Sequence, residues 1–264
     1  MCIVMYDRRI NVLNFLIMKL QASSVSQAHR LDVLKTLESR YSDRSGLNRI
    51  RLKLKISAWY LIIYFAASLK RLLDIFGAIF GLLIFSPIFI IVSFLIYSHD
   101  GGAVIFTQRR VGRWGREFEF PKFRSMVKNA EDLKSSLLSQ NQHADGVTFK
   151  IKKDPRITPI GRFIRKTSID ELPQLWCVLM GDMSLVGPRP QLPDEVLKYS
   201  LAQRRRLDIK PGLTCFWQIE GRGDIPFSKQ ADLDIQYVDS QSIFLDIFLI
   251  IKTVPAVLFG KGAY

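Results

Sequence analysis

The segment from Arg165 to Pro190 organises the chain. It opens with two adjacent carboxylates behind a basic cluster, Arg165-Lys166-Thr167-Ser168-Ile169-Asp170-Glu171-Leu172-Pro173-Gln174-Leu175, and it closes with Val186-Gly187-Pro188-Arg189-Pro190. Adjacent residues on a helix point about 100° apart, since a turn takes ~3.6 residues. One carboxylate can therefore attack a phosphorus while the other holds a metal. The neighbouring Arg162, Arg165, Lys166 and Arg189 would keep both carboxylates ionised and bind phosphate oxygens.

The same residues also fit a purely structural role. Asp170 suits the N-cap of a helix that has Pro173 in its first turn, the apolar run 175–180 as its body and Gly181 as its stop. The two interpretations are compatible, because a helix N-terminus also attracts phosphate. The pattern alone leaves capping and chemistry both open. A carboxylate nucleophile, a divalent cation and surrounding cations are the groups that phosphoryl transfer uses.

The composition combines a strong positive charge with long apolar runs. The 264 residues carry a formal net charge of +14, a pI near 9.8 and 48% hydrophobic residues. Nucleic-acid binders share the charge but seldom the apolar runs, so we expect no nucleic-acid partner and favour a membrane surface or anionic substrates. Cys2, Cys177 and Cys215 lack paired spacing, which is typical of free thiols in a reducing compartment. No signal peptide is expected at the N-terminus.

Residues 1–65 are predicted to form a basic extension ahead of a catalytic domain at 66–264. A short amphipathic helix is expected over 10–20, and 39–54 is charged. A flexible or membrane-skimming segment and a solvated tail remain alternatives. The apolar segment 57–69 is short for a membrane span but suits an interface.

Residues 75–97 contain no charged side chain and have the length of a transmembrane helix. Ser86 and Pro87 lie at the centre, where proline removes one backbone hydrogen bond. Both flanks are basic, and the positive-inside rule disfavours sending either flank across the bilayer. A re-entrant helix-break-helix over 70–99 satisfies both observations if Ser86 or other groups bind the freed carbonyls. A kinked spanning helix is the alternative.

The other elements are predicted from local patterns. Short strands are expected over 103–107 and 118–120, with a turn at Gly112 and Gly115. Lys122 and Arg124, which flank an aromatic residue, fit either phosphate binding or surface charge. Helices are expected over 129–142, 193–206 and 227–237. Turns or loops are expected over 143–148, 154–158, 210–214 and 221–224, and a strand-like segment over 215–219. The apolar segment 242–258 fits either an interfacial helix or core.

These motifs, in their order, resemble the bacterial sugar transferase family, the monotopic polyprenyl-phosphate phosphoglycosyl transferases. The resemblance runs from Lys70 to Tyr264. It is carried by Lys70-Arg71-Leu72-Leu73-Asp74, Ser86-Pro87, Val104-Ile105-Phe106-Thr107-Gln108, Lys122-Phe123-Arg124-Ser125-Met126, Asp170-Glu171-Leu172-Pro173-Gln174, Gly181-Asp182-Met183-Ser184-Leu185-Val186-Gly187-Pro188-Arg189-Pro190 and Lys210-Pro211-Gly212-Leu213-Thr214. The implied fold is α+β: a mostly helical monotopic membrane protein with a re-entrant helix, interfacial amphipathic helices and a small β-hairpin.

The resemblance implies a two-step reaction. Asp170 would attack the β-phosphorus of a UDP-sugar and expel UMP, and polyprenyl (undecaprenyl) phosphate would then take the phosphosugar. Glu171 would help to hold Mg²⁺. The positions that match substrate-binding residues are Lys122, Arg124, Arg165, Arg189 and Asp234. The segments 214–218 and 260–264 look like members that start exopolysaccharide or O-antigen repeats, so glucose or galactose is expected as the sugar. Many such members carry four transmembrane helices and a further domain before the catalytic domain. In the region before its catalytic domain, this chain instead resembles the small members of the family.

The implied location is the cytoplasmic face of the bacterial inner membrane, with a homodimer and downstream glycosyltransferases as further partners. Two other functions remain as alternatives. One is a non-catalytic basic scaffold on anionic lipids, and the other is a glycosyltransferase that moves the sugar alone. The first leaves the carboxylate pair between Arg165 and Arg189 unexplained, and the second would release UDP instead of UMP.

Overall fold

The computed structural model describes residues 46–130, 154–221 and 225–259, together with Asp32, Lys35, Thr36, Asp132 and Leu133; of 46–49 and 256–259 it describes the backbone alone. Several predicted features lie outside these residues. They are the amphipathic helix over 10–20, most of the helix over 129–142, the loop over 143–148, most of the loop over 221–224 and the C-terminal match at 260–264.

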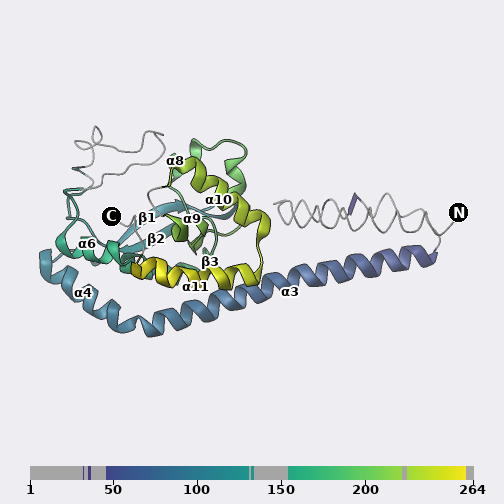
Figure 1. The fold of residues 1–264 in the computed structure, drawn as a ribbon, viewed down its shortest axis with the longest axis horizontal. Coiled ribbons are helices and arrows are strands. Elements are labelled where there is room, and N and C mark those ends of the chain that lie inside the picture. The colour runs from purple at the N-terminus through teal and green to yellow at the C-terminus, as the bar shows by residue number, and fades with distance from the viewer. Residues whose placement is uncertain are drawn as a thin grey trace.

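Two helices, α3 (Gly46–Ile84) and α4 (Ser86–Asp100), run along one side of the molecule and meet at a bend (Figure 1). The bend is 57°, and it confirms the break predicted at Ser86 and Pro87. The Ser86 hydroxyl donates to the Leu83 carbonyl at 2.8 Å. That carbonyl is the one left without a backbone donor by Pro87, because a helical N–H bonds the carbonyl four residues back. Ser86 therefore covers the freed carbonyl, as predicted.

Within the described residues, no single helix is long and apolar enough to cross a bilayer; only α3 and α4 taken together meet that length and composition. The helix α3 is continuous over 39 residues, although the sequence predicted separate segments at 39–54 and 57–69. Lys70, Arg71 and Asp74 interrupt the apolar character of this helix, and each bonds to the rest of the fold. The boundary predicted at 65 and 66 falls inside α3.

A β-hairpin packs above these helices. Strands β1 (Ile105–Val111) and β2 (Glu117–Phe123) pair antiparallel, with Phe106 opposite Lys122. The hairpin is confirmed, but its strands are longer than predicted and the first begins two residues later. The tip holds the 3-10 turn η1 (Arg113–Gly115). Phe118 and Phe120 are buried while Glu117 and Glu119 are exposed, so Lys122 shares the inward face by the period of two.

The segment that organises the chain folds into consecutive short elements. They are α6 (Pro159–Lys166), the 3-10 helix η3 (Ile169–Gln174), α7 (Leu175–Met180) and β3 (Ser184–Val186). Gly181 ends α7 in the left-handed conformation, with φ +97°, as predicted. Strand β3 pairs in parallel with β4 (Gly212–Thr214), where the sequence predicted only a turn.

The C-terminal part is helical. The helix predicted over 193–206 is two pieces, α8 (Pro193–Leu197) and η4 (Gln203–Leu207). The strand-like segment predicted over 215–219 is wrong, because α9 (Phe216–Glu220) is a helix whose Phe216 and Ile219 pack together on the core. The helix α10 (Phe227–Ser240) confirms the predicted one and extends it by three residues, and α11 (Ile243–Phe259) is shifted by one residue from the predicted apolar segment 242–258.

Helix α11 runs beside α3 (Figure 1) and faces two environments. Asp246 and Leu249 are fully buried, whereas Phe244 is 87% and Ile251 63% exposed. Core packing and an exposed apolar face, which the sequence left as alternatives, therefore occur on one helix. The helices α3 and α4 expose apolar side chains too, including Phe76, Phe80, Leu83, Ile90, Ile91 and Phe94.

Candidate active site

Both carboxylate oxygens of Glu171, in η3, are bound by cations. Lys122 Nζ donates to Oε1 at 2.8 Å, and Arg189 Nη1 donates to Oε2 at 3.0 Å. Arg189 Nη2 also binds Oε1. Burial alone would raise the pKa of Glu171, but the charges and hydrogen bonds of Arg189 and Lys122 outweigh it and hold the pKa well below its usual value. Glu171 is therefore an anion at neutral pH.

Asp170 differs sharply from its neighbour. Its residue is 7% exposed, and within 46–130, 154–221 and 225–259 no hydrogen bond or ion pair to its carboxylate is found. Burial raises the pKa of Asp170 to about 6, and the Glu171 charge adds to the rise, while Lys122, Arg165 and Arg189 oppose it. The site thus holds a charge-compensated carboxylate next to a buried one whose pKa is raised.

The two cations reach Glu171 from different elements. Lys122 lies on the inward face of β2, and its ammonium sits 5.2 Å from the centre of the Phe120 ring. Burial lowers its pKa, against the pull of Glu171. Arg189 follows β3, and the Gly187 N–H bonds Thr214 O at 3.0 Å while the Gly212 N–H bonds Pro188 O at 2.9 Å. The β3–β4 pair, which the sequence did not predict, therefore places Arg189.

Asp234 lies behind Arg189 and does not contact the carboxylate pair. It is fully buried in α10, where Arg206 Nη2 binds its Oδ2 at 2.5 Å. The same nitrogen donates to the Arg189 carbonyl at 3.4 Å, and Arg206 Nη1 donates to the Tyr199 hydroxyl at 2.9 Å. Burial raises the pKa of Asp234 to about 6. Asp234 thus contacts Arg206, which binds the Arg189 carbonyl, and hydrogen bonding from the Arg189 backbone also lowers the pKa of Asp234.

Of the other predicted site residues, Arg165 lies near the carboxylate pair and Arg124 does not. Arg165, in α6, lies close enough to lower the pKa of Asp170. Arg124 is not brought to the carboxylate pair: its guanidinium pairs with Asp100 at the end of α4. That ion pair ties the end of the α3–α4 pair to the hairpin.

The capping role considered for Asp170 is wrong. Ser168, in the left-handed region with φ 55°, stands at the N-cap of η3, and no side chain caps η3 or α7. Asp170 is the second residue of a 3-10 turn. Pro173 lies inside that turn, which keeps 169–174 from joining α7 as one α-helix.

Sequence reasoning gave Arg110 no place in the site. It lies on β1, 5.5 Å over the Phe120 ring, and donates to Pro190 O at 3.3 Å. Burial and the nearby Arg189 cation lower its pKa to about 10. The alternation of β1 predicts that one of the adjacent Arg109 and Arg110 faces inward, which was the available signal.

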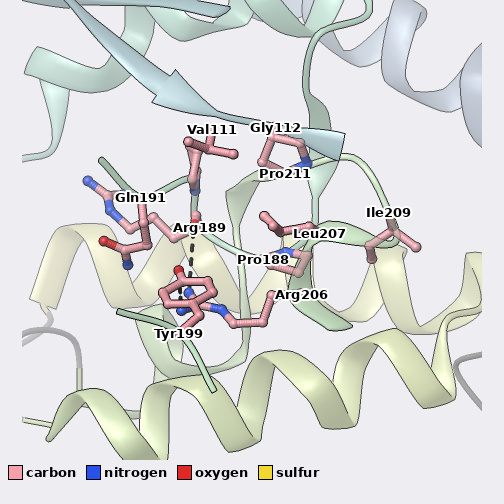
Figure 2. A pocket seen from close by; sticks show the side chains of 11 residues that line it. Val111, Gly112, Pro188, Arg189, Gln191, Tyr199, Arg206, Leu207, Ile209 and Pro211 are labelled. Atoms are coloured by element: carbon pink, nitrogen blue, oxygen red, sulfur yellow. Dashed lines mark hydrogen bonds between the residues drawn. The ribbon is translucent and has the colours of Figure 1, made fainter. Parts of the chain in front are cut away.

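A small crevice borders Arg189 (Figure 2). Pro188, Leu207, Ile209 and Pro211 supply its apolar wall. The figure also shows Arg206 bonded to Tyr199 and to the backbone of Arg189. Among the described residues, no cluster of three or more His, Cys, Asp or Glu side chains is arranged to hold a metal ion.

The hairpin, the bent helix pair and the carboxylate pair bound by cations are the features expected from the resemblance, and a family model and curated relatives match the same part of the chain. A family model described as bacterial sugar transferase matches residues 65–260. The chain belongs to that family, as the motifs predicted.

The galactosyl transferase CpsE of Streptococcus agalactiae is 55% identical over 197 residues, covering 74% of this chain and 43% of the relative. The undecaprenyl-phosphate galactose phosphotransferase of Salmonella typhimurium is 45% identical over 199 residues, covering 74% and 42%. The exopolysaccharide production protein ExoY of Rhizobium meliloti is 40% identical over 198 residues, covering 74% and 88%. The matched part thus spans less than half the length of the first two relatives and most of the third.

Proposed function

We propose that the protein transfers a hexose 1-phosphate from a UDP-sugar to polyprenyl phosphate and releases UMP, as the first membrane step of polysaccharide biosynthesis. The observation that carries the proposal is the pairing of a buried, poorly solvated Asp170 with a Glu171 that is fully compensated by Lys122 and Arg189. The names of the relatives support the sugar phosphate and the lipid carrier, with galactose as the first candidate.

The reaction proceeds in two displacements at one phosphorus. An Asp170 carboxylate oxygen attacks the β-phosphorus of the donor, the bond from that phosphorus to the bridging oxygen breaks, and UMP leaves with the electron pair. An oxygen of polyprenyl phosphate then attacks the same phosphorus and breaks its bond to Asp170, which restores the carboxylate. A covalent intermediate lets a water-soluble donor and a lipid acceptor use the site in turn.

The cations supply charge where phosphate oxygens must bind. Arg189 presents a planar fork that suits phosphate as well as carboxylate, and Arg165 and Lys122 add positive charge around Asp170. A diphosphate that reaches Asp170 would compete with Glu171 for Arg189. That competition frees Glu171 oxygens only while substrate is bound.

Mg²⁺ fits this donor set in one way. Magnesium is usually held by one or two carboxylates together with substrate phosphates, and the described residues offer the Asp170–Glu171 pair and no larger cluster. We therefore infer that Glu171 holds Mg²⁺ jointly with the donor diphosphate. The ion would neutralise charge on the phosphates.

We further propose that α3, α4 and α11 bind a bilayer at its cytoplasmic face. The exposed side chains of these helices include Phe80, Phe94 and Phe248, at 65%, 68% and 50% exposure. Contiguous exposed apolar surface marks a membrane or a protein contact. A re-entrant course of α3 and α4 keeps both basic flanks on one side.

A nucleotide-release assay tests the function. Purified protein in lipid nanodiscs is mixed with UDP-galactose or UDP-glucose, with and without undecaprenyl phosphate, and the released nucleotide is identified. UMP release, with a galactose-phosphate adduct on the peptide holding Asp170, is the expected result. Release of UDP would instead indicate transfer of the sugar alone, and no release with any donor would favour the scaffold.

Asp170→Asn is the decisive variant, because the amide cannot form the adduct. It should abolish UMP release while the protein still co-sediments with vesicles. Asp232→Asn, the same change at an exposed position of α10, serves as the matched control. Turnover retained by Asp170→Asn would remove Asp170 as the nucleophile.

A further inference from the structure

One turn of α3 bonds to both ends of the segment that carries the site. Arg71 donates from Nη1 to Val178 O and from Nη2 to Leu179 O, each at 2.7 Å. These are carbonyls of the last turn of α7; Val178 O also accepts the Gly181 N–H at 3.2 Å. Arg71 therefore fixes the end of the helix that directly follows Asp170 and Glu171.

Lys70 and Asp74, on the same part of α3 as Arg71, hold the strand that leads to Arg189. Asp74, which is 2% exposed, accepts the N–H of Leu185 and the hydroxyl of Ser184 at 2.9 Å each. Lys70 pairs with Asp246 of α11 at 2.6 Å and donates to Val186 O at 3.3 Å. Both ends of β3 are thus bound to α3.

The close packing continues along the same face of the helix. A side chain at Gly77 would meet Leu185 of β3 at 2.5 Å, and one at Gly81 would meet Leu175 of α7 at 3.0 Å. Positions 70, 74, 77 and 81 follow the helical period, so they form one stripe. Charged and small residues make up this stripe, while apolar residues such as Phe76 and Phe80 are exposed elsewhere on α3.

The unit held in this way runs from the carboxylate pair to Arg189. Glu171 stands before α7, Arg189 stands after β3, and the ion pair between them closes the unit. A shift of α7 relative to β3 would separate Asp170 from the cations that must hold the phosphate.

We propose that Arg71 and Asp74 are positioning residues for the phosphoryl transfer: from the membrane helix α3, they fix α7 against β3 so that Asp170 and Arg189 act on one phosphate. This role rests on the proposed function. A remote mutation that displaces reacting groups by about 1 Å can cost about 10²-fold in rate. Removal of Arg71 or Asp74 should therefore lower kcat on that scale.

The experiment compares Arg71→Met with Arg71→Lys, and Asp74→Leu with Asp74→Asn, in UMP release. Methionine and leucine remove the bonds, lysine keeps a donor and the charge, and asparagine keeps an acceptor for Leu185 and Ser184. We expect kcat to fall about 10²-fold in the first of each pair and to recover in the second. Arg51→Lys, an exposed change on the same helix, is the control.

A double-mutant cycle separates positioning from general loss of structure. If Arg71 acts through the placement of Arg189, the loss in Arg71→Met with Arg189→Lys should fall short of the product of the single losses by about fivefold or more. A product that is simply multiplicative would overturn the proposal, as would unchanged kcat in Arg71→Met and Asp74→Leu.

Hydrogen exchange gives a readout that does not depend on activity. Amides of 175–190 should exchange faster in Arg71→Met than in wild type, while those of the β-hairpin should not change. If the amides of 175–190 exchanged at the same rate in Arg71→Met and in wild type, the positioning role would be overturned. This holds whichever sugar nucleotide the wild type uses. Absence of UMP release by the wild type would count against the proposed function alone.

Discussion

Arg189 binds Glu171 with both terminal nitrogens of its guanidinium, so this cation of the site is occupied by a carboxylate. The pair joins residues on either side of α7 and β3. It compensates a charge that burial would otherwise disfavour, and it fixes the orientation of the guanidinium that is proposed to bind phosphate.

Glu171→Gln should slow UMP release and flatten its dependence on Mg²⁺ concentration. A neutral amide is a weaker Mg²⁺ ligand and leaves the charges of Lys122 and Arg189 uncompensated. The measurement is a Mg²⁺ titration of the initial rate. Glu119→Gln, the same change at an exposed position of β2, should titrate like the wild type. An unaltered metal response in Glu171→Gln would remove its metal role.

The rate should fall with acid as Asp170 takes up a proton. Its pKa is about 6, and only the ionised carboxylate is a nucleophile, so the first displacement should lose about tenfold per pH unit well below that value. Rapid-quench measurement of UMP release between pH 4.5 and 8 reads this limb. A rate that is flat down to pH 5 would contradict the assignment of the pKa to the nucleophile.

Asp170→Asn should stabilise the fold at neutral pH. The folded pKa of about 6 lies above the ordinary 3.8, so the folded state binds the proton more tightly and stability falls as the pH rises from about 3.8 to about 6. The gain should approach about 3 kcal/mol at pH 7 to 8 and vanish below about pH 4. Denaturant unfolding at several pH values measures it, with Asp232→Asn as the control. A loss of stability at pH 7.5 would show that the ionised carboxylate is favourably paired.

Gln174→Met should also stabilise the fold. The Gln174 residue is fully buried, and within the described part of the chain neither Oε1 nor Nε2 has a hydrogen-bond partner. A buried amide without partners costs about 1–3 kcal/mol, and methionine of similar length removes that cost. The exposed Gln236→Met should change the free energy of unfolding by less than about 0.5 kcal/mol. Destabilisation by Gln174→Met would mean that the amide is satisfied in solution.

Changes at Ser86 and Pro87 should alter the bend between α3 and α4. Pro87→Ala restores an N–H for the Leu83 carbonyl, so the helices should straighten, most of all in combination with Ser86→Ala. Distances between spin labels on α3 and α4 in nanodiscs report the angle. Ser86→Ala alone keeps the proline and should keep the bend. An identical distance in the double variant would show that the surrounding packing sets the bend.

The sequence predicted the elements whose cause is local. A proline beside a serine predicts a break, and Gly181 predicts the end of α7, because both act on their own backbone. The sequence did not reveal what Lys70, Arg71 and Asp74 bind, because their bonding partners lie more than a hundred residues away. Strand β4 was missed because its partner strand β3 is distant in the sequence. A strand was predicted for α9 because its short aromatic run shows no helical periodicity.

The candidate site was also predicted in part. Asp170, Glu171, Lys122 and Arg189 come together, and Arg165 contributes its charge, whereas Arg124 is bound by Asp100 and Asp234 acts at one remove. A sequence motif gives the residue types but not which carboxylate oxygen each cation will bind. That depends on the register of β1 with β2 and of β3 with β4, which is set by packing.

The cations on Glu171 come from 49 residues before it and 18 residues after it. A chain that emerges from the ribosome N-terminus first exposes α3 and α4 well before Arg189 is made. If α3 and α4 bind lipid as proposed, the growing polypeptide can settle there while its reactive centre does not yet exist, and catalytic competence begins only afterwards.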